Sequence, residues 1–156
     1  MEGKSFSSKG NDLKAKADKK LKGSFFGNLM KGKSERQDDA KELYVQAANC
    51  YKLSQDFESA VLCYELCIKC EENELDAAGY YKEAAICIKN TDTDKYFTYL
   101  KKAIEMYSLS GKISTSARLA KDAAQEFEDN YNYEEAIEMY EKAGQLYSME
   151  NQSTQG

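Results

Sequence analysis

The sequence predicts an all-α protein, a right-handed superhelical stack of helical hairpins with about seven helices. Proline is absent from all 156 residues, so nothing in the chain interrupts a helix as proline would. Amphipathic segments of about 14–18 residues alternate with short polar joints, which is the pattern of helices with one buried face. Small and large residues also recur at fixed offsets, which indicates stacked structural repeats.

The chain begins with residues 1–10, which we expect to be flexible, and continues as one solenoid over 11–156. Its first helix is expected over about 11–22. A glycine-rich loop over 23–33 separates this helix from the rest of the stack. Loops of this composition leave the backbone free to turn, so the loop marks the first break in the helical pattern.

Start and stop signals place six further helices. Ser34 and Gln37 are three residues apart and form the pattern of a capping box. Gly111 is suited to end a helix, and Asn132, with Glu135 three residues later, is suited to start one. The six helices are expected over about 34–54, 57–72, 75–89, 94–110, 113–129 and 133–148.

A repeat of five positions, at offsets 0, 3, 12, 16 and 19, predicts helical hairpins of the tetratricopeptide type. Alanine lets the two helices of a hairpin approach, and a larger side chain fills the space between them. Three such hairpins can bury a shared core that one could not. The copies are Ala48, Tyr51, Ala60, Tyr64 and Cys67; Ala84, Cys87, Tyr96, Leu100 and Ala103; and Ala124, Phe127, Ala136, Tyr140 and Ala143.

Charge is distributed unevenly along the chain, whose net charge is −5. Residues 1–36 contain ten basic and four acidic residues, whereas residues 37–156 contain twelve and twenty-three. The basic segment suits the anionic face of a membrane, where each lysine contributes about 1 kcal/mol; the alternative is a solvated charged tail. The acidic remainder argues against nucleic acid as a partner.

The loop contains an apolar group where no core is expected. Phe25, Phe26, Leu29 and Met30 stand among glycines and lysines, in the stretch "KGSFFGNLMKGK". These neighbours do not favour burial inside the protein. We therefore expect a surface outside the chain to cover these four side chains.

Signs of chemistry are weak, so we expect no enzyme and no cofactor. Histidine is absent, which removes the commonest general base and metal ligand. The stretch "GNLMKGKS" over 27–34 matches a phosphate-binding pattern, but the helical segment before it offers no strand to feed such a loop. One helix face carries three cysteines, Cys63, Cys67 and Cys70, whose thiolates could bind a metal ion. The favoured interpretation is that they are small side chains packed between helices.

The five cysteines are expected to be reduced thiols. Their number is odd, and the lysine-rich N-terminus lacks the apolar region of a secretory signal. No apolar run approaches the length of a transmembrane helix. We therefore expect a cytoplasmic protein that associates peripherally with the cytosolic face of membranes.

Four stretches resemble the N-terminal half of soluble NSF attachment proteins of the alpha type. "GSFFGNL" is similar to the membrane-contacting loop of that family. The stretches "AANCYKLSQDFESAVLCY", "KKAIEMYSLSGK" and "AAQEFEDNYNYEEAIEMYEKAGQLY" are similar to successive helices of its solenoid, in order and spacing. The resemblance extends over about 11–151, nearly the whole chain.

The resemblance implies an adaptor that binds the SNARE four-helix bundle and recruits the hexameric ATPase NSF, without chemistry of its own. It implies lipid as the cover of Phe25, Phe26, Leu29 and Met30. Basic residues of the family hold the acidic SNARE surface, and the matching positions here are Lys112, Arg118, where the family has lysine, and more loosely Lys89 and Lys52.

The resemblance covers only half of such a protein, because family members are about twice as long. The surface that stimulates NSF belongs to the half that is not matched, so we expect SNARE binding without support for disassembly. A different interpretation is a generic tetratricopeptide-like scaffold for some other peptide. It would explain the repeats and leave the double phenylalanine loop without a role.

Overall fold

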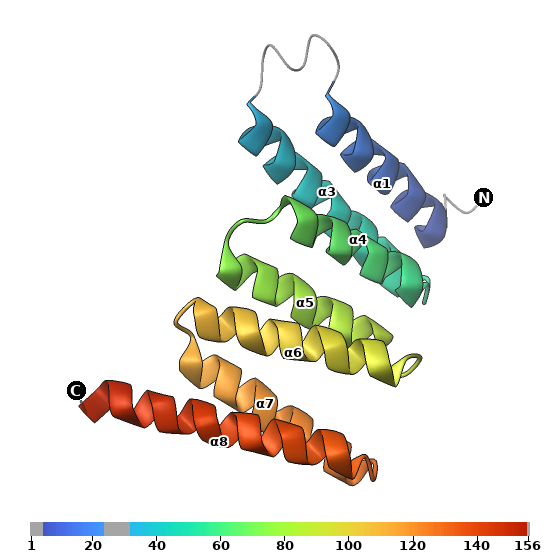
Figure 1. Ribbon diagram of the computed structural model, residues 1–156. Coiled ribbons are helices and arrows are strands. Elements are labelled where there is room, and N and C mark those ends of the chain that lie inside the picture. Colours follow the sequence, from blue (N-terminus) through green and yellow to red (C-terminus); the bar gives the residue numbers. More distant parts are fainter. Residues whose placement is uncertain (1–4, 24–31, 156) are drawn as a thin grey trace.

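The structure, a computed structural model, describes residues 5–23 and 32–155. These residues form seven helices and no strand, which confirms the predicted stack of helical hairpins (Figure 1). The helices are α1 (Phe6–Lys22), α3 (Lys33–Leu53), α4 (Phe57–Cys70), α5 (Glu74–Ile88), α6 (Thr93–Leu109), α7 (Ile113–Asp129) and α8 (Tyr133–Gln155).

Each helix packs against its neighbour in the sequence, so the helices follow one another along the stack. The repeated hairpins are α3 with α4, α5 with α6, and α7 with α8, while α1 lies against α3. Figure 1 shows α1 at one end of the stack and α8 at the other. A solenoid of this kind has two end faces that no further described helix covers.

Side-chain caps determine where several helices begin. The hydroxyl of Ser5 accepts the backbone N–H of Ser8 at 3.2 Å, and α1 therefore starts earlier than expected, at Phe6. The capping box predicted at Ser34 and Gln37 is wrong. The N-cap of α3 is Gly32, without a side-chain hydrogen bond, so Ser34 already lies inside the first turn, past the position where its hydroxyl could cap the helix.

Three turns contain a residue with a positive φ, two of them within hairpins and one between hairpins. Gly111 has φ 86° after α6, and the N–H of Lys112 bonds back to the carbonyl of Tyr107 at 2.9 Å. The predicted role of Gly111 is thus confirmed. Gln55 after α3 and Tyr131 after α7 adopt the same left-handed conformation, with φ 62° and 64°. A side chain is unfavourable there, so these two turns are strained in a way that the sequence did not indicate.

Fourteen of the fifteen repeat positions are buried, and the exception lies at the end of the stack. Tyr140 on α8 is 39% exposed, whereas its equivalent Tyr64 on α4 is 2% exposed. The equivalent pair Ile137 and Val61 differs in the same way, since Ile137 is 58% exposed and Val61 is 5% exposed. The next hairpin covers these positions on α4, but none of the described residues packs on the outer face of α8.

Glycine and two tyrosine hydrogen bonds hold α1 close to α3. A Cβ at Gly10 would lie 2.9 Å from the ring of Tyr51, so only glycine permits this approach without a shift. The Tyr51 hydroxyl donates to the side-chain oxygen of Asn11 at 2.6 Å, and the Tyr44 hydroxyl donates to Asp18 at 2.5 Å. The first helix is therefore an integral layer of the stack.

We expect Gln55→Gly to stabilise the fold by about 0.5–1 kcal/mol, because glycine adopts a positive φ without steric cost. Urea denaturation of the two proteins measures the difference. Gly111→Ala is the matched control and should lose a similar amount, since no atom lies within 4 Å of the added Cβ and the cost is purely conformational. A lower unfolding free energy for Gln55→Gly would show that the turn is not strained.

Candidate functional site

The structure divides the four predicted cations between two edges of the stack. Lys52 lies near the end of α3 and Lys89 directly follows α5, whereas Lys112 directly precedes α7. These three helices run in the same direction, so the C-terminal ends of α3 and α5 lie at the edge opposite to the N-terminal end of α7 (Figure 1). Lys89 pairs with Glu126, which stands about 21 Å along α7 from Lys112. The four residues therefore do not form one cluster.

Lys52 connects its helix to two others. Its ammonium lies 3.6 Å from the carboxylate of Glu83 on α5 and 5.7 Å from the ring centroid of Tyr64 on α4. Burial alone would lower the pKa of Lys52, but the contact with Tyr64 and the charge of Glu83 outweigh it and raise the pKa. Lys52 thus forms an electrostatic contact between the first two repeated hairpins.

Lys89 has the equivalent role at the next junction. It forms an ion pair with Glu126 on α7, and the hydroxyl of Tyr96 donates to the same carboxylate at 3.3 Å. The side chains of Lys89 and Glu126 are both partly exposed, so the pair is screened by water and contributes modestly to stability. Its charge is already matched by a residue of this chain.

Lys112 and Arg118 differ from the other two cations because both are exposed and neither forms an ion pair with a described residue. Lys112 is the N-cap of α7, and Arg118 lies in its second turn. Lys121, one turn beyond Arg118, is also exposed and unpaired among the described residues. The sequence reasoning missed Lys121, although its spacing of three residues from Arg118 places it on a neighbouring part of the helix surface.

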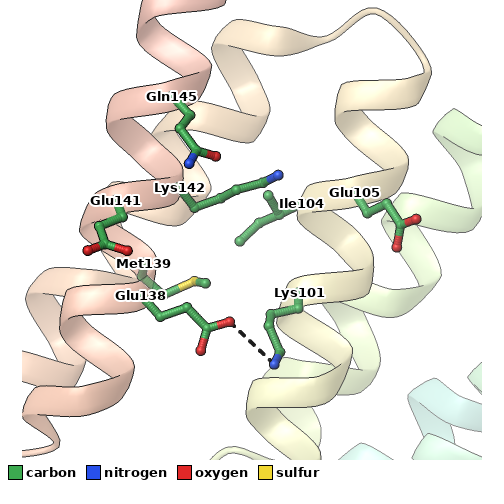
Figure 2. A pocket seen from close by; sticks show the side chains of 8 residues that line it. All are labelled: Lys101, Ile104, Glu105, Glu138, Met139, Glu141, Lys142 and Gln145. Atoms are coloured by element: carbon green, nitrogen blue, oxygen red, sulfur yellow. Dashed lines mark ion pairs between the residues drawn. The ribbon is translucent and has the colours of Figure 1, made fainter.

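A charged cleft of about 420 Å³ separates α6 from α8 (Figure 2). Lys101 on α6 and Glu138 on α8 form an ion pair across it at 3.5 Å, and Lys101 also lies over the ring of Phe97. Its apolar members, Ile104 and Met139, belong to the buried core. The cleft therefore marks a junction between two hairpins that polar side chains bridge.

A second cleft, also of about 420 Å³, lies between α3 and α5 and is mostly apolar. Val45 and Tyr64 line it together with Leu75, which is 38% exposed. Lys52 and Glu83 stand at the same cleft and place their ion pair beside the apolar surface. Its chemistry suits an apolar side chain of a peptide with a polar group next to it.

The predicted membrane-contacting residues lie outside the described part of the chain. These are Phe25, Phe26, Leu29 and Met30. The neighbouring helix α1 ends at Lys22 with three lysines in its last turn, and α3 resumes at Lys33. These two helices, α1 and α3, lie next to each other at one end of the stack (Figure 1).

The cysteine face considered for a metal is part of the core. Cys63, Cys67 and Cys70 are buried, and the Cys67 thiol donates to the backbone carbonyl of Lys41 at 3.6 Å. Burial raises the pKa of Cys63 and of Cys67 to about 12, which keeps both as neutral thiols. Within the described residues no group of three potential ligands is arranged to hold a metal ion.

A sequence model of the soluble NSF attachment protein family, SNAP, matches residues 8–156. The chain belongs to this family. The match includes every described helix except the first residues of α1, and thus covers the whole hairpin stack. The resemblance drawn from the loop and from the repeats is therefore confirmed.

Curated relatives of this SNAP-family chain include alpha-soluble NSF attachment proteins. That of Vitis vinifera is 29% identical over 150 residues, covering 94% of this chain and 50% of the relative. That of Dictyostelium discoideum is 34% identical and covers 91% of this chain and 52% of the relative. A vesicular-fusion protein of Komagataella phaffii is 32% identical, covering 90% and 49%. The chain thus spans about half the length of the relatives it matches.

The length and hydrophobicity of a helix determine whether it can cross a bilayer. A spanning helix needs about 20 consecutive, mostly apolar residues. In the ranges 5–23 and 32–155, no helix is both long and apolar enough to span a membrane.

Thiol labelling should distinguish the one half-buried cysteine of this SNAP-family chain from the other four. We expect Cys50 to react first at pH 8, at least about a hundredfold faster than Cys63 and Cys67, because burial withholds both access and ionisation. Mass spectrometry after timed labelling measures the order. Cys50→Ser should remove the fast phase, and a fast phase that persists would contradict the packing described.

Proposed function

We propose that this chain is a non-enzymatic adaptor that binds the assembled SNARE four-helix bundle through the exposed cations of α7. The observation that carries the proposal is the contrast between the cations. Lys112 and Arg118 are exposed without a carboxylate partner among the described residues, whereas Lys52 and Lys89 are already paired. Only unpaired cations can offer their full charge to an acidic partner.

Membership of the SNAP family supports the proposal, since the relatives are named for NSF attachment and vesicular fusion. A rigid stack is also suited to the task. Helices α7 and α8 hold the cations in a fixed arrangement, so binding an extended bundle would not require the adaptor to fold at the same time. Exposed charges of this kind contribute to orientation and association rate more than to affinity.

The proposal assigns a second contact to the loop. Phe25, Phe26, Leu29 and Met30 would insert at the cytosolic surface of a membrane beside the SNARE bundle. Burying each phenylalanine contributes about 1.5–3 kcal/mol, which gives weak attachment by itself. Two weak contacts that act together bind much more tightly than either, because the first raises the effective concentration for the second.

A second candidate function is supported by the apolar cleft between α3 and α5. Val45, Tyr64 and Leu75 could receive a peptide side chain, as in a generic tetratricopeptide-like scaffold. This function would need neither the loop nor the cations of α7. Peptide binding that survives Phe25→Ser with Phe26→Ser and depends on the cleft would favour it.

Removing two of the three exposed cations at α7, by Lys112→Ala with Arg118→Ala, should weaken binding to a soluble SNARE bundle about tenfold without unfolding the chain, because each exposed charge contributes roughly 0.5–1 kcal/mol. Titration by fluorescence anisotropy measures the affinity. The matched control is Lys69→Ala with Lys95→Ala, two exposed lysines on α4 and α6. Equal losses in both variants would show that only net charge matters and would refute the proposed site.

Competition would test whether the chain binds SNAREs without supporting their disassembly. We expect an excess of this chain to slow disassembly by a full-length adaptor and NSF, because it would occupy the bundle without supplying the other half of the relatives. The rate of disassembly is followed by loss of energy transfer between labelled SNAREs. The Lys112→Ala, Arg118→Ala variant should compete less well, and an unchanged rate with the unmodified chain would contradict the proposal.

A further inference from the structure

The outer face of α1 carries a stripe of lysines. Lys9, Lys16 and Lys20 are exposed, and their offsets of seven and eleven residues place them within about 40° of each other around the helix. The stripe runs about 16 Å along the helix axis. The buried residues Gly10 and Ala17 lie on a different side, against α3.

These lysines are not neutralised by the fold. None of the three forms an ion pair with a described residue, although Lys9 lies over the ring of Phe6. Lys14 behaves differently, since it is half-buried and pairs with Asp18 at 3.3 Å. The stripe is therefore a set of free positive charges on one surface.

The charge of the stack changes sign from one end to the other. Helix α1 contains six lysines and two aspartates, so its net charge is +4. Helix α8 contains five glutamates and one lysine, so its net charge is −4. Because α1 and α8 occupy opposite ends (Figure 1), the molecule has a positive end face and a negative one.

A shallow cleft adjoins the stripe. Lys9 and Lys16 line it together with Leu13 on α1 and Cys50 on α3, and most of its surface is apolar. Asp12 is the acidic residue in its lining. A surface that combines lysines with an adjacent apolar hollow matches the chemistry of phospholipid headgroups, which carry phosphate above glycerol and acyl chains.

We propose that the Lys9, Lys16 and Lys20 stripe of α1 docks on the anionic phospholipid headgroups of a bilayer. The inference deepens the proposed function, because it rests on membrane attachment and assigns a second, electrostatic contact to a described helix. Contact through the end face would also orient the stack with α8 pointing away from the membrane.

The shape of the molecule favours a flat bilayer over nucleic acid. A planar anionic surface can touch the α1 end without approaching the acidic remainder, because the repulsive charges lie further along the stack. A long polyanion would need a positive track along several helices, and residues 37–156 have twelve basic and twenty-three acidic residues. Nucleic acid is therefore an outcome to test.

The test is co-sedimentation of the whole chain with SNARE-free vesicles of phosphatidylcholine containing 0–40% phosphatidylserine. We expect partitioning to rise with phosphatidylserine and to fall with salt. Lys9→Gln with Lys16→Gln and Lys20→Gln should reduce it by about two orders of magnitude, since each lysine near such a surface contributes about fivefold. Circular dichroism checks the helices, and glutamine is a good helix former.

The matched control is Lys69→Gln with Lys82→Gln and Lys95→Gln, which removes the same charge from exposed positions on α4, α5 and α6. It should keep partitioning within about threefold of the unmodified chain. Equal losses in both triple variants, or partitioning that ignores phosphatidylserine, would overturn the proposal. So would tighter binding to single-stranded DNA that requires the same three lysines.

The outcome is separable from that of the proposed function. SNARE bundles on purely zwitterionic vesicles test the α7 contact without anionic lipid. A chain that binds these bundles but ignores phosphatidylserine would retain the proposed function and refute the lysine stripe. A chain that binds anionic vesicles but no SNARE bundle would support the lysine stripe and refute the proposed SNARE binding.

Discussion

Close approach of helices at small residues is the constraint on which the rest of this structure depends. Ala48 and Ala60 in the first repeated hairpin, with Ala84, Ala124 and Ala136 in the other two, are almost completely buried between helices. A larger side chain at such a position would separate the two axes, because a packed interior has no room to absorb added volume. Gly10 imposes the same condition where the ring of Tyr51 meets α1.

Polar side chains then join one hairpin to the next. Lys52 with Glu83 and Lys89 with Glu126 connect α3, α5 and α7, while Lys101 with Glu138 connects α6 and α8. The hydroxyl of Tyr99 adds a bond from α6 to Glu65 on α4. Each pair is partly exposed and individually weak, so these contacts define relative placement more than they add stability. A cation that is already paired with a carboxylate of this chain attracts an acidic partner less strongly.

Function is therefore expected to concentrate where the stack leaves charge or apolar surface without an internal counterpart. The cations of α7 and the lysines of α1 are two such places. The face of α8 is a third, since Ile137 and Tyr140 are exposed at positions that are covered in the earlier hairpin. The relatives are about twice as long as this chain. A repeat architecture makes such faces interpretable, because each position has equivalents whose environment shows what the surface can pack against.

Local pattern was sufficient to predict most of the fold. Periodicity located all seven described helices, and the offsets that begin at Ala48 and Ala84 identified residues that are buried in the core. Both signals depend on helix geometry, which neighbouring residues determine. The turn at Gln55 and the start of α3 at Lys33 escaped this reasoning, because neither a positive φ at a glutamine nor an N-cap without a side-chain hydrogen bond has a signal in the local pattern.

The candidate site depended more on tertiary structure. Four cations were selected from the sequence as one group, but Lys89 meets Glu126 thirty-seven residues later and Lys112 lies at the opposite edge. Pairing between distant residues is set by how hairpins stack, and a pattern of single residues contains no information about it. Composition and periodicity thus established the helices and the uneven charge, and the resemblance of four stretches indicated the family, whereas packing determined which charges remained free to bind.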